Sequence, residues 1–178
     1  MKLTLVAAVS ILSTLASGLA LPDLTRRRTV IRPVIAIMVK SEFSNTPFQT
    51  QIPEVSISKE GQIVETLLGF VVPACTGKCT ISFDAIAAEG SRTLQLFTTG
   101  WYPTALDTWN VRPYKDIHKG TILVSTTGAD LDTVSEDFGL AFDCPSTTTS
   151  YGFDVVPVGG YDYVIWDITK GGFIITCS

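Results

Sequence analysis

The sequence has little of the chemistry on which enzymes most often depend. Of its 178 residues, one is a histidine, two are methionines and four are cysteines. Any Ser-His-Asp or Cys-His mechanism would depend on His118, which lies in a charged stretch, residues 112–120, with no nucleophile motif nearby. We therefore expect His118 to lie in a solvated loop.

Recognisable catalytic and cofactor motifs are also missing. The chain has no GxSxG, no HExxH, no phosphate-binding loop and no dinucleotide fingerprint. Its four cysteines all have a structural assignment, which leaves no obvious free thiol. These absences predict a protein that is not an enzyme and that needs no cofactor.

Long apolar runs are confined to the N-terminus. Met1 and Lys2 precede an apolar run, residues 3–15, and small residues then lead to Ala20, which is the pattern of a secretory signal. We predict a signal peptide over residues 1–20. No second run is long enough to span a bilayer, so we expect a secreted product, extracellular or held in a cell wall.

The segment after the predicted signal is short and basic. Residues 21–28 end in Arg26, Arg27 and Arg28. A pro-segment that is removed after Arg28 and a solvated basic arm are both open interpretations. The formal net charge of the whole chain is −4 and becomes more negative without these arginines, so nucleic acid is not an expected partner. Residues 29–178 have the length of one domain.

From Thr29 onward the pattern is that of strands. Short apolar segments and period-two alternation are bounded by Gly, Pro, Asn and Ser, and the helical period is nearly absent. We predict an all-β fold: a two-sheet antiparallel β-sandwich, jelly-roll-like and stabilised by disulfides. The predicted strands are 30–39, 52–58, 62–72, 79–83, 92–98, 108–111, 121–125, 139–144, 150–156, 161–168 and 172–177, with a loop over 41–51 and a turn at 59–61.

The cysteines predict two disulfides, because the chain is expected to enter an oxidising compartment. Strand alternation turns Cys79, Cys144 and Cys177 toward the core, and Cys75 lies in the corner after Pro73. We favour Cys79 with Cys144 and Cys75 with Cys177, since closing long loops removes more unfolded-state entropy. The pairing Cys75 with Cys79 and Cys144 with Cys177 stays open. A zinc site has less support, because the C-x3-C spacing has no second close pair.

Two groups of side chains are candidates for a binding site. Trp101, Tyr102, Trp109 and Tyr114 occupy one connector-rich span and can either stack on sugar faces or pack at the end of the sandwich. Trp166, between Ile165 and Asp167, is expected in the core. The acidic group Asp130, Asp132, Glu136 and Asp137 is a weak candidate for calcium, and we expect it to lie in a surface loop or one helical turn.

Four segments together resemble a known family. They are GFVVPACTGKCTISF from Gly69, GSRTLQLFTTG from Gly90, FDCP from Phe142 and YDYVIWDITKGGFIITC from Tyr161. These segments are similar to the C-terminal domain family of the fungal ubiquitin-3-binding protein, called the But-two domain, over residues 62–178. Cys79 and Cys144 match the cysteines of that family, and Cys75 is an addition. The resemblance implies a secreted or surface β-sandwich of filamentous fungi with no established catalytic residues.

Three hypotheses for function follow. The first is a non-enzymatic extracellular or cell-wall-associated interaction module, whose partner is a glycan or an extracellular protein. The second is a carbohydrate-binding sandwich that uses the aromatic side chains of residues 101–114. The third is a glycan-active hydrolase with carboxylates near residues 130–137.

Overall fold

The computed structural model describes residues 28–83, 85, 87–124, 132–135 and 139–178. The predicted signal peptide, residues 1–20, and the basic arm, residues 21–28, lie outside this range apart from the exposed Arg28. The described residues form strands and turns, and they include no helix with the length and apolarity needed to cross a bilayer. The all-β prediction is confirmed.

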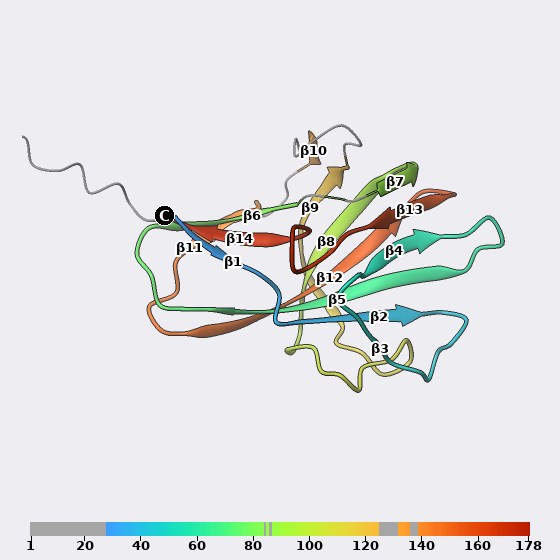
Figure 1. Cartoon of the computed structure of the whole chain (residues 1–178), viewed down its shortest axis with the longest axis horizontal. Helices are drawn as coiled ribbons and strands as arrows, with labels where there is room; N and C mark the ends of the chain where they lie inside the picture. The colour runs from blue at the N-terminus through green and yellow to red at the C-terminus, as the bar shows by residue number, and fades with distance from the viewer. Residues whose placement is uncertain (1–27, 84, 86, 125–131, 136–138) are drawn as a thin grey trace, which may run out of the picture.

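Two antiparallel sheets make up the fold (Figure 1). The smaller sheet has the strand order β1-β14-β6-β11, with bounds Thr29–Ile31 (β1), Ile174–Cys177 (β14), Lys78–Ser82 (β6) and Ala141–Asp143 (β11). The larger sheet has ten strands: eight follow the path β10-β9-β8-β12-β5-β4-β13-β7, and β2 and β3 join them through β5. The bounds of its strands are Ile35–Lys40 (β2), Phe48–Gln49 (β3), Glu54–Ile57 (β4), Ile63–Val72 (β5), Ala87–Gly90 (β7), Thr93–Thr99 (β8), Lys115–Leu123 (β9), Asp132–Ser135 (β10), Thr149–Val158 (β12) and Asp162–Ile165 (β13).

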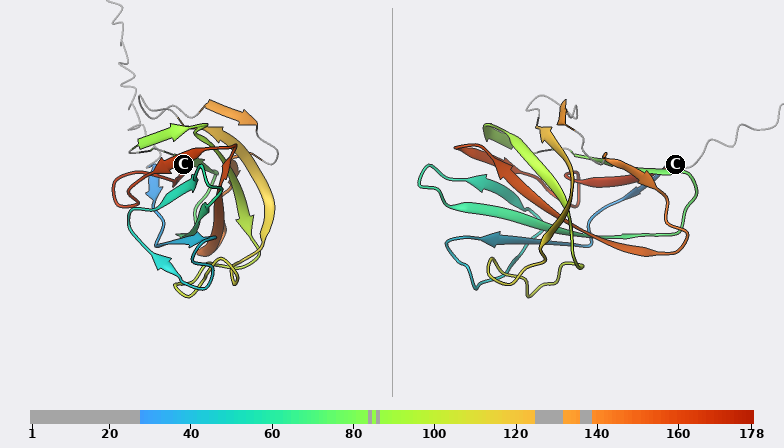
Figure 2. Two further views of the ribbon diagram at one scale, coloured as in Figure 1. Left: turned by 90° about the vertical axis from the view of Figure 1, so that its right-hand side faces the viewer. Right: turned by 180° about the vertical axis from the view of Figure 1, so that it is seen from behind.

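The small sheet covers one end of the large one. Figure 2 shows β5 and β12 running on past their neighbours, with β6, β11 and β14 lying against this extension. The main core fills the space between the sheets. Trp166 is fully buried there, with its ring centroid 5.3 Å from that of Phe83 and 5.8 Å from that of Phe173. The prediction that Trp166 belongs to the core is confirmed.

Strand β5 is buried on both of its faces. Leu68, Phe70 and Val72 belong to the main core between the sheets. Leu67, on the opposite face, packs in a second cluster with Ile37 and Val39 of β2. Because successive side chains of a strand alternate between faces, both faces of the large sheet need a cover at this point. The second cover is the connector between β8 and β9.

Local turn chemistry agrees with the sequence at the β4–β5 hairpin. Gly61 has φ +82°, and its amide donates to the carbonyl of Ser58 at 3.0 Å. The hydroxyl of Ser58 accepts from the amide of Glu60 at 3.2 Å. The predicted turn over residues 59–61 is therefore confirmed, since a residue with positive φ at this point favours glycine.

Several segments differ from the prediction. The predicted strand 30–39 is divided into β1 and β2, which belong to different sheets, and the predicted loop over 41–51 contains the short strand β3. Residues 108–111 form a turn and not a strand, and β9 begins at Lys115, well before the predicted start at 121. Residues 132–135 form β10, which pairs with β9, where we expected a loop or a helical turn. Residues 115–120 and 132–135 become strands because they pair with distant strands, and residues 108–111, which have a strand-like composition, find no such partner.

The structure corrects the favoured disulfide pairing. Cys79 is bonded to Cys177, so none of the bonds in the two pairings considered from the sequence is present. The structure has one disulfide among the four cysteines where two were predicted, and Cys75 and Cys144 are not bonded in it. The reason is register, because β14 pairs with β6 so that Cys177 lies directly opposite Cys79. The predicted orientation of the strand cysteines was right, since Cys79 and Cys177 are buried and Cys144 packs against the same core.

A glycine variant tests the packing around Trp166. Gly172 has φ +73°, and a Cβ atom at this position would collide with the ring of Trp166. We expect Gly172→Ala to lower the free energy of unfolding by about 2 to 4 kcal/mol, from left-handed strain together with overpacking. Urea-induced unfolding measures this loss.

The matched control is Gly61→Ala, which changes a glycine of similar φ, +82°, with no atom within 4 Å of the added Cβ. It should lose only about 1 kcal/mol from backbone strain. Equal losses in the two variants would show that contact with Trp166 is not the cause.

Candidate functional site

The connector between β8 and β9, residues 100–114, is held in compact turns by its own polar side chains. The carboxylate of Asp107 accepts from the amide of Thr104 at 2.8 Å and from its hydroxyl at 3.1 Å. The amide of Val111 donates to the hydroxyl of Thr108 at 3.2 Å, and the amide of Thr108 donates to the carbonyl of Val111 at 2.9 Å. These local hydrogen bonds compete with strand formation and explain why residues 108–111 are not a strand.

A buried ionic network fastens this connector to the large sheet. Glu65 of β5 is 4% exposed, and its carboxylate lies 3.1 Å from a guanidinium nitrogen of Arg112 and 2.9 Å from the ammonium of Lys115. Lys115 also lies 3.7 Å from a carboxylate oxygen of Asp154 in β12. Two acidic groups of the sheet therefore face two cations from the end of the connector and the start of β9.

Asp154 is fully buried within this network. Burial and then the negative charge of Glu65 raise the pKa of Asp154 to about 7, against the lowering influence of Lys115 and Arg112. Neither Asp154 nor Glu65 is accessible to a substrate, so the pair is a structural anchor and not a catalytic dyad. We had not predicted it. The available signal in the sequence was one acidic residue with apolar residues close on both sides in each strand, Glu65 in IVETLL and Asp154 in FDVV.

Trp109 and Arg112 are the residues of the connector that face the large sheet. Trp109 is half-buried against the cluster of Ile37, Val39 and Leu67. The guanidinium of Arg112 lies over its ring, 4.0 Å from the centroid, and also donates to the carbonyl of Trp109 at 2.6 Å. Trp109, one of the four predicted ligand-binding aromatics, is therefore mainly a packing residue.

Trp101 and Tyr114 are exposed and lie together. Trp101 is 49% exposed and Tyr114 is 60% exposed. Their ring centroids are 5.7 Å apart and the ring planes meet at 78°. The ring of Tyr114 lies over Gly100, where a Cβ atom would collide with it. Two apolar rings thus form an exposed corner at the base of the connector, which we call the aromatic corner.

Tyr102 is half-buried and differs from these two rings. Its ring lies against Gly69 of β5, 2.6 Å from where a Cβ of that residue would be. Burial raises the pKa of the Tyr102 phenol. Of the four predicted aromatics, the structure brings Trp101 and Tyr114 together at the surface and uses Tyr102 and Trp109 to attach the connector.

The connector is also tied to the loop after β2. The amide of Asn110 donates to the carbonyl of Ser44 at 3.0 Å, and its side-chain amide donates to the side-chain oxygen of Asn45 at 2.9 Å. Figure 1 shows the connector beside β3, on the side of the large sheet away from the small sheet. The connector therefore contacts two separate parts of the chain and is fixed at several points.

The remaining predicted site residues have other settings. His118 lies within β9 and not in a loop, half-buried, with its ring centroid 4.8 Å from that of Phe97. The prediction of a solvated loop histidine was wrong, because β9 extends through it. Asp132 begins β10. Asp130, Glu136 and Asp137, the rest of the weak metal candidate, lie outside the described residues.

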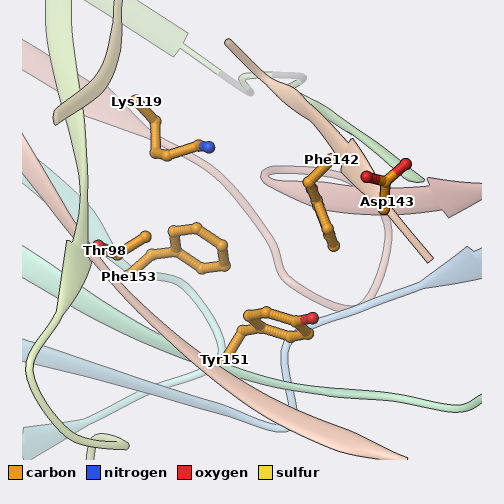
Figure 3. A pocket seen from close by; sticks show the side chains of 6 residues that line it. All are labelled: Thr98, Lys119, Phe142, Asp143, Tyr151 and Phe153. Carbon is orange, nitrogen blue, oxygen red and sulfur yellow. The ribbon is translucent and has the colours of Figure 1, made fainter. Parts of the chain in front are cut away.

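A small hollow lies between the sheets and is shown in Figure 3. Its volume is about 220 Å³. The ring centroids of Phe142 and Tyr151 are 5.3 Å apart on its wall, and burial lowers the pKa of Lys119 at its edge. This volume is below the roughly 300 to 1,000 Å³ of typical ligand pockets, so we assign it no ligand. Its lining residues are Thr98, Lys119, Phe142, Asp143, Tyr151 and Phe153.

Comparison with protein-family profiles and with curated proteins finds no match for this chain. The candidate site is therefore defined by its geometry alone.

The buried network gives the stability a characteristic pH dependence. The pKa of Asp154 rises from 3.8 in the unfolded chain to about 7 in the fold, so the folded state binds the proton more tightly. Stability is therefore greatest below pH 4 with respect to this group and falls as the pH rises toward 7, by on the order of 1.4 kcal/mol for each pH unit. We expect Asp154→Asn, which cannot ionise, to remove this decline in urea unfolding measured between pH 4 and 8.

Asp143→Asn is the matched control. Asp143 forms a surface ion pair with Lys78 at 2.7 Å, and its side chain is 85% exposed. Its removal should change stability by less than about 1 kcal/mol and leave the pH profile unchanged. If the free energy of unfolding changed in the same way between pH 4 and 7 in the wild type and in Asp154→Asn, the assignment of the decline to Asp154 would be contradicted.

Proposed function

We propose that this chain is a secreted, non-enzymatic interaction module that binds polysaccharide through the aromatic corner of Trp101 and Tyr114. The observation that carries the proposal is the exposure of these two rings side by side on an anchored connector. Sugar rings present apolar C–H faces, which pack against aromatic faces, and the tyrosine hydroxyl can exchange hydrogen bonds with sugar hydroxyls.

The anchoring of the connector supports a binding role for the exposed rings, because it holds them in place before a ligand arrives. Arg112 and Lys115 hold its end against Glu65, and Trp109 packs beneath it. A surface that is ordered before it meets a ligand loses less conformational entropy on binding.

Secretion is supported by two independent features. The first 20 residues have the signal pattern, and the Cys79–Cys177 disulfide suits an oxidising compartment. The four segments that resemble the But-two domain family point to the same setting, a fungal surface or cell wall. Recovery of the mature chain from inside cells, and none from the medium or wall, would overturn this part of the proposal.

Retention on insoluble polysaccharides tests the binding surface. We expect the mature chain to be retained on at least one of chitin, β-glucan and cellulose. Trp101→Ala and Tyr114→Ala should each weaken retention about tenfold or more, the equivalent of about 1.4 kcal/mol of lost contact. Depletion isotherms of the protein from solution measure the change.

Two variants from the same connector serve as controls. Leu106→Ala removes an 81% exposed apolar side chain that is not one of the two rings, and it should leave retention nearly unchanged. Trp109→Ala should lower the free energy of unfolding by about 3 kcal/mol, because it removes a packed ring. No retention on any of the three polymers, or equal retention of wild type and Trp101→Ala, would count against polysaccharide binding.

A further inference from the structure

All four cysteine sulfurs meet at one point of the fold. The Sγ atoms of Cys75, Cys79, Cys144 and Cys177 lie within 4.8 Å of one another. The sulfur of Cys79, bonded to Cys177, also lies 3.6 Å from that of Cys75 and 3.3 Å from that of Cys144. Three segments that are distant in the sequence therefore share one sulfur cluster, at the start of β6 and the end of β14 in the small sheet.

The backbone holds Cys75 and Cys144 next to each other. The amide of Cys75 donates to the carbonyl of Pro145 at 3.1 Å, and the amide of Cys144 donates to the carbonyl of Gly77 at 3.1 Å. These two bonds continue the pairing of β11 with β6, in which Asp143 lies opposite Lys78. The proximity of the two sulfurs is thus a consequence of the sheet and not of a chance side-chain rotation.

We propose that Cys75 and Cys144 form a second disulfide in the secreted protein. Register commits Cys79 to Cys177, which leaves Cys75 and Cys144 as the remaining pair, with their Sγ atoms within 4.8 Å of each other. The result is a pairing that differs from both alternatives considered from the sequence.

The chemistry requires a disulfide oxidant, such as the active-site disulfide of a secretory-pathway oxidoreductase. The thiolate of Cys144 attacks one sulfur of the oxidant, which forms a mixed disulfide and releases the other oxidant sulfur as a thiolate. The thiolate of Cys75 then attacks the sulfur of Cys144 and displaces the second oxidant sulfur. Two electrons pass to the oxidant, and the two protons lost by the cysteines balance its conversion to a dithiol.

The setting of the thiols is consistent with this order of attack. Burial, a hydrogen bond with Cys144 and the charge of Cys144 together raise the pKa of Cys75 to about 11. A thiol that seldom ionises is a slow first nucleophile, so Cys75 is better suited to the second, intramolecular step.

The second bond would join the corner after Pro73 to the end of β11. This corner leads into β6, whose core residues Cys79 and Ile81 lie at the centre of the small sheet. Tyr151, which lines the hollow in Figure 3, packs against the same core as Cys75 and Cys144, and the pKa of its phenol is raised by burial and further by these two cysteines. The two disulfides would then fix both neighbours of β6, namely β14 and the end of β11.

Tryptic peptide mapping of the full chain, secreted from an oxidising host, tests the proposal. Cleavage after Lys59, Lys78, Arg92, Lys119 and Lys170 gives four peptides that each contain one cysteine. We expect peptide 60–78 to be linked to peptide 120–170 and peptide 79–92 to be linked to peptide 171–178. Denatured, unreduced protein should take up no alkylating reagent.

Variants separate this pairing from disulfide exchange within the cluster. The double variant Cys75→Ser/Cys144→Ser should keep the link between peptides 79–92 and 171–178, show no free thiol and melt at a lower temperature than wild type. The variant Cys75→Ser alone should give one alkylated cysteine. A single-disulfide wild-type protein with Cys75 and Cys144 both alkylated would overturn the proposal, as would peptide 60–78 linked to 79–92 or to 171–178.

Metal analysis of the same preparation tests the alternative that the four cysteines bind zinc. Four sulfurs within 4.8 Å resemble the donor set of a tetrahedral zinc site when all four are reduced. One zinc per chain in the purified protein, with all four cysteines alkylated after chelation, would overturn the second disulfide. Absence of zinc together with the expected peptide pairs would support it.

Discussion

The burial of β5 on both faces is the constraint on which the rest of the structure depends. From Val64 to Phe70 every residue of this strand is buried. One face lies in the main core between the sheets, and on the other face the connector covers Leu67 together with side chains of the neighbouring strand β2. A strand in this position cannot leave either side to solvent, because both faces carry large apolar side chains. The connector is therefore part of the fold. The need to cover this face of β5 also fixes the position of the two rings that the connector exposes.

The face that the connector covers is not simply apolar. It carries Glu65 and Asp154 beside a small cluster of Ile37, Val39 and Leu67. Removing two carboxyl groups from water is unfavourable unless cations accompany them, and Arg112 and Lys115 supply these. Apolar contact alone would tolerate several positions of the connector, whereas a guanidinium that must reach both a carboxylate and the Trp109 ring accepts few. The cost of burying these charges thus defines where Trp101 and Tyr114 lie.

Strand alternation was enough to predict the all-β class and the inward orientation of the strand cysteines. The turn residues 59–61 predicted the β4–β5 turn, and the apolar surroundings of Trp166 predicted its place in the core. It failed where distant pairing or side-chain hydrogen bonds decide the outcome. Residues 115–120 are polar and alternate poorly, yet they pair with β8 and carry His118 into the sheet. Residues 108–111 have the composition of a strand, but Thr108 closes a turn there. For the candidate site, the sequence located the aromatic span but could not separate its exposed rings from its buried ones.

The cysteine pairing shows what alternation leaves undetermined. Alternation assigns a face to each cysteine, but only the strand order β14-β6-β11 assigns neighbours. The entropy of loop closure could not replace this information, because it grows only logarithmically with loop length. Bonds from Cys79 to Cys177 and to Cys144 close separations of 98 and 65 residues, a difference of less than about 1 kcal/mol. The register of the sheet places the sulfur of Cys177 in bonding distance of Cys79 and keeps the sulfur of Cys144 as a non-bonded neighbour. This geometric difference decides the pairing more strongly than the small difference in loop-closure entropy. Geometry of the folded sheet, and not the unfolded chain, therefore selects the partners in this cluster.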